Sequence, residues 1–375
     1  MNPGDTLPVW MDRLVLPAVN VALALAVCAA VLAAAGHDPA QALASLLRGA
    51  FGSRLGLSYT LYYATTFVFT GLAVAVALHA GLFNIGGEGQ ATLGGLGVAL
   101  VALAWADRLP AALLLPLMVL AAMLAGMAWA AVPAALQAWR GSHVVITTVM
   151  FNLIASALLG WLLVDVLQEP GNMAPESRAF GDAARMPGVH ELLGALGWDW
   201  PASPLNLSLL LALGALPATG WLLWRSPAGY AMRACGFSPE AARYAGIAPP
   251  RQAMTAMLVA GALAGLVGVN EIAGVQGRLV SDFVAGAGFA GIAVALIGRN
   301  HPVGIALAAL GFGALHQGGA ELSFELPGFP REMVTTLQGL VVLFAGAMGR
   351  LAAPALRQVH RRLAGRGRAT EAARG

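Results

Sequence analysis

The sequence contains no lysine, so all 21 of its basic residues are arginines. A phosphate-binding loop of the Gly-x-x-x-x-Gly-Lys-Ser/Thr type requires a lysine, so the chain cannot be an ATPase of that class. Charged residues of every kind make up only 10% of the 375 residues, against about 25% in an ordinary soluble domain. Hydrophobic residues make up 58%. A chain of this composition would expose wide apolar surface in water, so we expect it to reside in a membrane.

Cysteine is scarce as well, and Cys28 and Cys235 cannot supply a disulfide framework or a zinc site of usual spacing. The catalytic patterns His-Glu-x-x-His and Gly-x-Ser-x-Gly are missing too. We therefore expect no metal, no cofactor and no enzymatic activity in this chain. The net charge of +3 comes from arginines that flank apolar runs, which favours lipid headgroups over nucleic acid as the partner.

Long apolar runs are what the sequence has in abundance. A transmembrane helix needs about 20 such residues, and these runs lack the alternation of membrane β-strands. Ten runs meet this description, at residues 15–35, 58–80, 88–106, 111–136, 145–164, 206–224, 253–273, 284–298, 302–318 and 333–348. The sequence therefore predicts an all-α, polytopic transmembrane bundle of about ten spans.

The placement of arginine predicts how the chain is oriented. If both termini are cytoplasmic, 14 of the 21 arginines fall in inner segments, as the positive-inside rule requires. The predicted parts are a cytoplasmic N-terminus at 1–14, a transmembrane domain at 15–348 and a basic cytoplasmic tail at 349–375. Within the transmembrane domain, the acidic loop 165–205 would be extracytoplasmic and the loop 225–251 cytoplasmic.

The segment Gly81–Gln90 interrupts apolar sequence with several glycines and three polar residues, Asn84, Glu88 and Gln90. Irregular backbone at membrane depth is tolerated only where it lines a cavity or is covered by protein. A glutamate there is a candidate functional residue. Alternatively, Asn84 and Glu88 cap the helix that follows by accepting its free amides. The spacing alone leaves both interpretations open.

The loop 225–251 carries a short helix with clear start and stop signals. Ser238 is a typical N-cap, Pro239 suits the first position, and Glu240 adds an acid to the first turn. The helix would continue to Ala245 and end at Gly246. A solvated connector has little need of such signals, so we favour a helix that docks into a partner's groove.

Two further features have more ordinary explanations. Gly286–Gly291 matches a dinucleotide-binding fingerprint by letter, but no strand precedes it, so close helix packing or a second broken helix is expected. Polar residues in or near the spans serve either as interhelical hydrogen-bonding groups or as path lining, and Glu271 can also be explained as reaching water. These residues are Asn152, Asn270, Glu271, Gln276, His316 and Gln317.

Three segments in order, Leu82–Gln90, Arg233–Ile247 and Gly288–Pro302, resemble permeases of bacterial ABC importers of the nucleoside and simple-sugar type. Branched-chain amino acid and ribose permeases are more distant relatives of that group. The resemblance covers roughly 15–348, which would be the permease domain. It implies a multi-pass protein of the bacterial inner membrane, with a second related permease subunit, two ATP-binding subunits that hydrolyse ATP, and an extracytoplasmic solute-binding lipoprotein.

The resemblance also implies roles for residues. Arg233–Ile247 would be the coupling helix that receives the motion of the ATPase, through Arg233, Gly236, Pro239, Glu240, Ala241, Ala242, Tyr244 and Gly246. Asn84, Glu88 and Gln90 match the signature segment near the translocation path. We add Asn152, Asn270 and Glu271 as candidates because polar groups are rare in spans. Nucleosides or purines are the first expected substrates and simple sugars the second.

Two alternatives belong to other classes. In an ion-coupled secondary transporter, Glu88 and Glu271 would be proton or sodium sites. A membrane-embedded enzyme would need clustered acids or a nucleophile pair, whereas the acids here are isolated.

Overall fold

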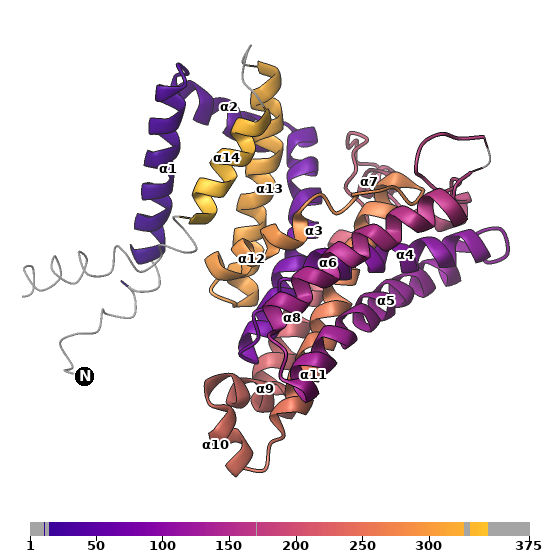
Figure 1. Cartoon of the computed structure of the whole chain (residues 1–375). Coiled ribbons are helices and arrows are strands. Elements are labelled where there is room, and N and C mark those ends of the chain that lie inside the picture. Colours follow the sequence, from indigo (N-terminus) through magenta and orange to yellow (C-terminus); the bar gives the residue numbers. More distant parts are fainter. Residues whose placement is uncertain (1–10, 12–14, 170, 326–330, 344–375) are drawn as a thin grey trace, which may run out of the picture. The chain divides into compact units, whose positions relative to one another are not determined.

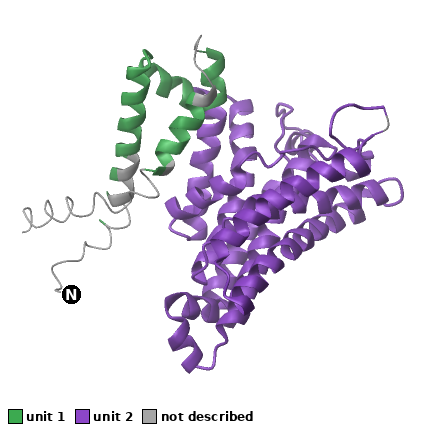
Figure 2. Cartoon of the chain, in the orientation of Figure 1, with its two compact units in different colours: residues 1–47, 319–375 green, residues 48–318 purple. Residues whose placement is uncertain are grey.

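The computed structural model describes residues 11, 15–169, 171–325 and 331–343, and in this part of the chain the named elements are all helices (Figure 1). The all-α class predicted from the sequence is therefore confirmed. The N-terminal segment 1–14, apart from residue 11, and the basic tail 349–375 lie outside the described residues. The chain forms two compact units, residues 1–47 with 319–375, and residues 48–318 (Figure 2).

The smaller unit, 1–47 with 319–375, has a small apolar core of its own. It contains α1 (Leu16–Ala34), most of α2 (Pro39–Phe51), the end of α13 (Pro302–Glu325) and α14 (Arg331–Val342). Its core consists of Cys28, Leu32, Ala42, Leu322 and Leu337. The helix pair α1 and α2 bends by 117° at a short break.

The larger unit, 48–318, contains the remaining elements. They are α3 (Arg54–His79), α4 (Gly87–Trp105), α5 (Ala111–Arg140), α6 (Val144–Trp161), η2 (Leu162–Val166), η3 (Asp182–Ala184), α7 (Val189–Ala195), α8 (Ser208–Arg225), α9 (Pro227–Phe237), α10 (Pro239–Tyr244), α11 (Pro249–Gly265), η4 (Val269–Gln276), α12 (Ala287–Ile297) and the first part of α13. Here η2 and η4 are π-helical turns that extend α6 and α11, and η3 is a single 3₁₀ turn.

The helix α3 is the central element of this unit, with 18 of its 26 residues buried. The helices around it approach closely where glycines face each other. A Cβ on Gly94 of α4 would meet the backbone of Gly265 in α11, and one on Gly126 of α5 would meet the backbone of Gly261. Small residues allow such contact between helix backbones, which is the main packing device available inside a membrane.

The described helices account for part of the predicted spans. Each of the ten predicted runs overlaps a helix, and six helices are long and apolar enough to cross a membrane, or seven if α1 and α2 form one bent span. The six are Arg54–His79, Ala111–Arg140, Val144–Val166, Ser208–Arg225, Pro249–Gln276 and Pro302–Glu325. The helix α12 has only 11 residues, which is fewer than the about 20 of a usual transmembrane helix. The count of about ten stays a prediction.

The predicted loop 165–205 is an ordered cover over the end of η4. Its backbone amides at Ser177 and Met186 donate to the carbonyls of Leu279 and Ala273, at 2.9 Å each. Glu176 also pairs with Arg278 at 2.6 Å. The loop therefore fixes where the α11–η4 segment ends.

Candidate functional site

Glu271 lies in the π-helical turn η4 and is only 9% exposed. Two hydroxyls from α3 donate to its carboxyl group: Tyr62 Oη to Oε2, and Thr66 Oγ1 to Oε1 at 2.7 Å. Tyr62 and Thr66 are four residues apart and therefore share one face of α3. The interpretation that Glu271 simply reaches water is wrong, because the π-helical turn directs it toward α3.

The cluster around Glu271 extends through two asparagines. Asn270 Nδ2 donates to Thr66 Oγ1 at 2.8 Å, and Asn206 Nδ2 donates to Asn270 Oδ1 at 3.1 Å. Asn206 Oδ1 in turn accepts from the amide of Ser208, the first residue of α8, at 2.9 Å. One polar network therefore joins α3, η4 and the start of α8 inside an otherwise apolar bundle.

Glu88 occupies a second site, at the first turn of α4, where it is half-buried. Its Oε1 accepts from the backbone amide of Gly286 and its Oε2 from that of Gly288, both at 2.8 Å. These amides begin α12, and Gly286 has a left-handed backbone with φ of 80°. The sequence allowed Glu88 to cap the helix that follows it; Glu88 does act as a cap, but for α12, which lies 200 residues further along the chain.

The other polar residues of the broken segment hold it together. Asn84 Nδ2 donates to Gln90 Oε1 at 3.1 Å, and Asn84 Oδ1 accepts from the amide of Gly86 at 2.9 Å. Asn152 of α6 bridges the same segment, accepting from the amide of Gly89 at 2.9 Å and donating to the carbonyl of Ile85 at 3.0 Å. Irregular backbone here is covered by protein, as its position in a membrane domain requires.

The six candidate path residues therefore fall into two groups. Asn84, Glu88, Gln90 and Asn152 surround the break before α4, whereas Asn270 and Glu271 face α3 from η4. In both groups the polar atoms are engaged by protein partners, so in this conformation they join helices to one another.

The predicted docking helix exists, although its extent differs from the sequence-based expectation. Ser238 Oγ accepts from the amide of Ala241 at 3.3 Å, α10 runs from Pro239 to Tyr244, and Gly246 adopts a left-handed backbone with φ of 82°. Arg233–Ile247 is not one helix, because Ser238 takes an extended conformation that separates α9 from α10. Arg233 and Gly236 consequently belong to α9.

Most of the predicted coupling residues form one exposed surface at the end of the larger unit (Figure 1). Tyr244 is 96% exposed, and the neighbouring Phe237, which the sequence did not single out, is 91% exposed. Pro239, Glu240, Ala241 and Gly246 are exposed as well, while Ala242 is buried beneath them. Bare aromatic rings at the tip of a capped helix pair are typical of a surface that a partner covers.

The base of this surface is fixed to α3 by close backbone contact. A Cβ on Gly236 would meet the carbonyl of His79 and, at 3.0 Å, the amide of Gly81. His79, the last residue of α3, also contacts the carbonyl of Asn300 through Nε2 at 3.1 Å. The backbone of α9 therefore directly contacts the end of α3, the most buried helix of the unit.

Comparison with known proteins gives the family. The family described as the permease component of branched-chain amino acid transport systems matches residues 56–346. The chain belongs to this family. It is thus a membrane permease component of a transport system rather than an enzyme, and the resemblance seen in the sequence is confirmed.

Relatives of this permease are similar over nearly their whole length. The glucose ABC transporter permease of Haloferax volcanii is 37% identical over 92% of this chain and 90% of its own. The guanosine ABC transporter permease of Bacillus subtilis is 34% identical over 90% of this chain and 94% of its own. A nucleoside ABC transporter permease of Lactococcus lactis is 31% identical over 88% and 90%. No solved structure matches the permease.

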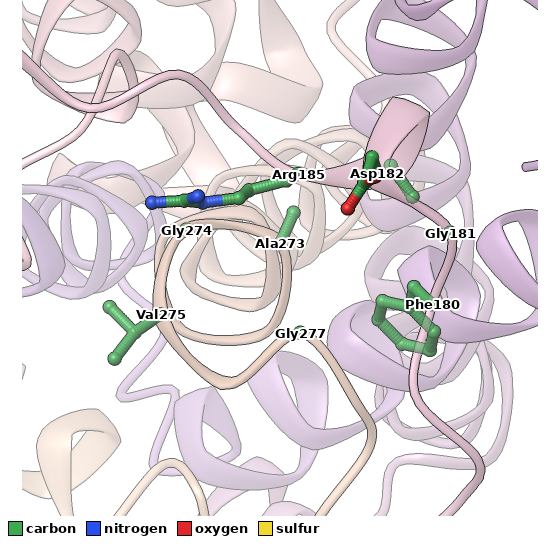
Figure 3. A pocket seen from close by; sticks show the side chains of 9 residues that line it. Phe180, Gly181, Asp182, Arg185, Ala273, Gly274, Val275 and Gly277 are labelled. Carbon is green, nitrogen blue, oxygen red and sulfur yellow. The ribbon is translucent and has the colours of Figure 1, made fainter. Parts of the chain in front are cut away.

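A small cavity of about 100 Å³ lies in this permease where the loop 180–185 meets the end of η4 (Figure 3). Its lining residues are Phe180, Gly181, Asp182, Ala184, Arg185, Ala273, Gly274, Val275 and Gly277. Arg185 also pairs with Glu191 of the same loop at 3.2 Å. The volume is below the roughly 300–1,000 Å³ of ordinary ligand pockets, so this cavity is too small for a nucleoside or a sugar.

The hydrogen-bond partners of Glu88 and Glu271 were not predicted from the sequence. Tyr62 and Thr66 had a usable signal, since polar residues four apart in an apolar span share one face. Asn206 and Gly286 had none, because each contacts a residue far away in the chain, Asn270 and Glu88 respectively.

Proposed function

We propose that this permease is the transmembrane subunit of an ABC importer that moves a small polar solute, with nucleosides as the first expected substrates and simple sugars as the second. The observation that carries this proposal is the α9–α10 surface, whose tip bears exposed Phe237 and Tyr244 and whose base contacts the end of α3 at Gly236. The transport of guanosine, nucleosides and glucose by the named relatives supports these substrate classes.

The expected ATP-binding partners are inferred from the absence of a phosphate-binding loop in this chain. Without lysine it has no phosphate-binding loop, so we infer that two separate ATP-binding subunits hydrolyse ATP and that one of them covers α10. A second, related permease subunit and an extracytoplasmic solute-binding lipoprotein complete the importer. ATP binding would close the two ATPase subunits, and α10 would pass that movement through α9 to α3.

The topology that we propose for this scheme has about ten spans in a bacterial inner membrane, with both termini cytoplasmic. The permease domain occupies 15–348, with the loop 165–205 outside and the coupling loop 225–251 inside. Arginine placement supports this orientation. The tail 349–375, which holds seven of the 21 arginines if counted from Arg350, would lie beside anionic headgroups.

The alternative of an ion-coupled carrier rests on Glu271, since a buried carboxyl group in a span is a candidate ion site by default. Uptake by the purified chain alone, driven by a proton or sodium gradient in vesicles, would support this alternative and contradict the importer.

The direct test is affinity purification of the tagged permease in mild detergent, followed by mass spectrometry. We expect a P-loop ATPase and a second polytopic permease to be recovered with it. If the permease purified alone under conditions that keep a known importer assembled, the proposal would be overturned.

Substitution at the tip tests the role of α10. In the double variant Phe237→Ser/Tyr244→Ser we expect at least a tenfold loss of recovered ATPase, because the two exposed rings would anchor the contact. The matched control is Trp198→Ser, which removes a 66% exposed ring from the loop 165–205 and should leave recovery unchanged. Equal recovery from the double variant and the control would exclude α10 as the docking surface.

A further inference from the structure

A row of aromatic rings lies between α3 and α13 in the larger unit. Tyr59, Tyr63 and Phe67 recur every fourth residue on α3 and therefore share one face of the helix. Phe312 and His316 of α13 are likewise four apart, and they meet this row. The ring centroids lie 6.5 Å apart for Tyr59 and Tyr63, 4.5 Å for Tyr63 and His316, and 5.8 Å for Phe67 and Phe312.

The row is buried at one end and open at the other. Phe67 and Phe312 are each 5% exposed, whereas Tyr59 and Tyr63 are half-buried and His316 is exposed. His316 lies within one of the candidate membrane spans, Pro302–Glu325. An ionisable side chain within a span is unstable against lipid and almost always faces the interior of a bundle or a water-filled cavity. The open end of the row therefore faces a polar path or another subunit.

The half-buried ring of Tyr63 is also packed against a second tyrosine of α3. The ring of Tyr62 lies 5.0 Å from that of Tyr63, and the Tyr62 hydroxyl donates to Glu271. Glu271 is in turn bonded by Thr66, one turn further along α3. Tyr63 thus rests against a side chain that is tied to η4, which pre-orients its ring at no further entropic cost when a ligand arrives.

The chemistry of this surface suits a flat, polar ring system. Every nucleobase has a π-face that stacks on aromatic side chains, and such stacking tolerates different bases. Tyrosine adds a hydroxyl at the ring edge and histidine two ring nitrogens, which can bond the edge of a base or a ribose hydroxyl. A lipid tail would gain nothing from these polar atoms.

We propose that Tyr59, Tyr63 and His316 form a stacking surface along the translocation path, on which the base of a transported nucleoside rests in transit. This inference depends on the proposed function, because it names the substrate class and the place where this permease contacts it. Glu271 acts here as a positioning residue, through Tyr62, and does not contact the solute.

The first experiment measures ATP-driven uptake of guanosine, adenosine and glucose by the complete importer in proteoliposomes. In Tyr63→Leu we expect the maximal rate of nucleoside uptake to fall about tenfold, whereas Tyr63→Phe, which keeps the stacking ring and loses only the hydroxyl, should lose clearly less. The matched control is Trp221→Leu, which removes a 64% exposed ring from another candidate span, in α8, and should transport like wild type.

Uptake by the wild-type importer tests the proposed function separately. If the wild type moves neither nucleosides nor glucose, the proposed function fails. If it moves guanosine and Tyr63→Leu does so at the wild-type rate, the proposed function holds and the stacking surface is overturned. A wild type that moves glucose but no nucleoside also overturns the stacking surface for a base.

A measurement on the unsubstituted protein guards against a Tyr63→Leu variant that fails to fold. The wild-type importer is photolabelled with 8-azidoguanosine during turnover, and the modified peptides are mapped. We expect adducts within Arg54–His79 or Pro302–Glu325, and excess guanosine should suppress them. Suppressible labelling confined to other helices would overturn the proposal.

Discussion

Glu88 and Glu271 are two carboxyl groups inside one bundle, the first half-buried and the second buried, and they receive different hydrogen-bond donors. The oxygens of Glu88 accept from backbone amides at the start of α12, whereas those of Glu271 accept from the hydroxyls of Tyr62 and Thr66. A backbone amide can only donate, while a hydroxyl can donate or accept. At residue 88 both terminal side-chain atoms must therefore be hydrogen-bond acceptors. At residue 271 the hydroxyl partners can instead reverse the direction of their hydrogen bonds.

The two sites also suggest different roles. Glu88 joins the start of α4 to the start of α12, and such a contact favours one fixed arrangement of these two helix starts. Glu271 joins η4 to α3 through side chains that can exchange partners, which suits a contact that breaks and re-forms while α3 moves. The following predictions test this difference, from the largest expected effect to the smallest.

Gly288→Ala should be the most damaging substitution at the Glu88 site. A Cβ at residue 288 would lie 2.6 Å from Glu88 Cα, and this backbone atom cannot move aside as the end of a flexible side chain could. We expect a loss of more than about 3 kcal/mol of stability, the upper range for overpacking. Thermal unfolding of the purified permease in detergent measures it. The matched control is Gly311→Ala in α13, where a Cβ meets nothing within 4 Å.

Glu88→Gln should destabilise the permease more than Glu271→Gln. A glutamine would turn its own N–H groups toward Gly286 N or Gly288 N, so that two donors face each other. The backbone donor is then left unpaired, which costs about 1–3 kcal/mol of stability. At residue 271 the hydroxyl of Tyr62 or Thr66 can turn and accept from the new amide, so we expect less than about 1 kcal/mol. Equal shifts of the unfolding temperature in the two variants would refute the comparison.

Tyr62→Phe removes one donor from Glu271 and keeps the ring. We expect a cost of about 1.5 kcal/mol, because the Glu271 oxygen is left without this bond in a buried site. Tyr63→Phe, at the next residue, serves as the control and should cost less, since no hydroxyl of Tyr63 bonds Glu271 in the described contacts. A Tyr62→Phe variant as stable as the control would mean that the Tyr62 hydroxyl contributes nothing to holding η4 against α3.

Ser238→Ala should have the smallest effect, although Ser238 caps α10 much as Glu88 caps α12. The cap of α10 is solvated, so its loss should cost about 1 kcal/mol, and Ser238→Gly only a few tenths. We expect global unfolding to stay unchanged and hydrogen exchange to accelerate only within Pro239–Tyr244. A global loss of stability would show that α10 is bound more tightly to the bundle than its exposure indicates.

Much of the architecture could be predicted from local sequence. Apolar runs foretold the helices because each must satisfy its backbone internally in lipid. Ser238, Pro239 and Gly246 foretold α10 because caps and helix stops are local signals. The family resemblance implied one coupling helix over Arg233–Ile247, whereas Ser238 ends α9 and begins α10, at the helix start that its capping signal predicted.

The candidate site was predictable only in part. The rarity of polar residues in spans drew attention to Glu88 and Glu271, but their partners lie roughly 200 residues away in the sequence. The π-helical turn η4, which directs Glu271 to α3 instead of to water, leaves no pattern that distinguishes it from an α-helical turn.

The sequence by itself determined that the chain resides in a membrane as helices, that it lacks a phosphate-binding loop, and that it forms a short capped helix after Ser238. These properties depend on composition and on residues a few positions apart. Only the tertiary structure decided which groups donate hydrogen bonds to Glu88 and Glu271, how α9 contacts α3, and which end of the aromatic row is exposed. Those contacts join segments far apart in the chain, and their geometry follows from how closely glycine-lined helices pack.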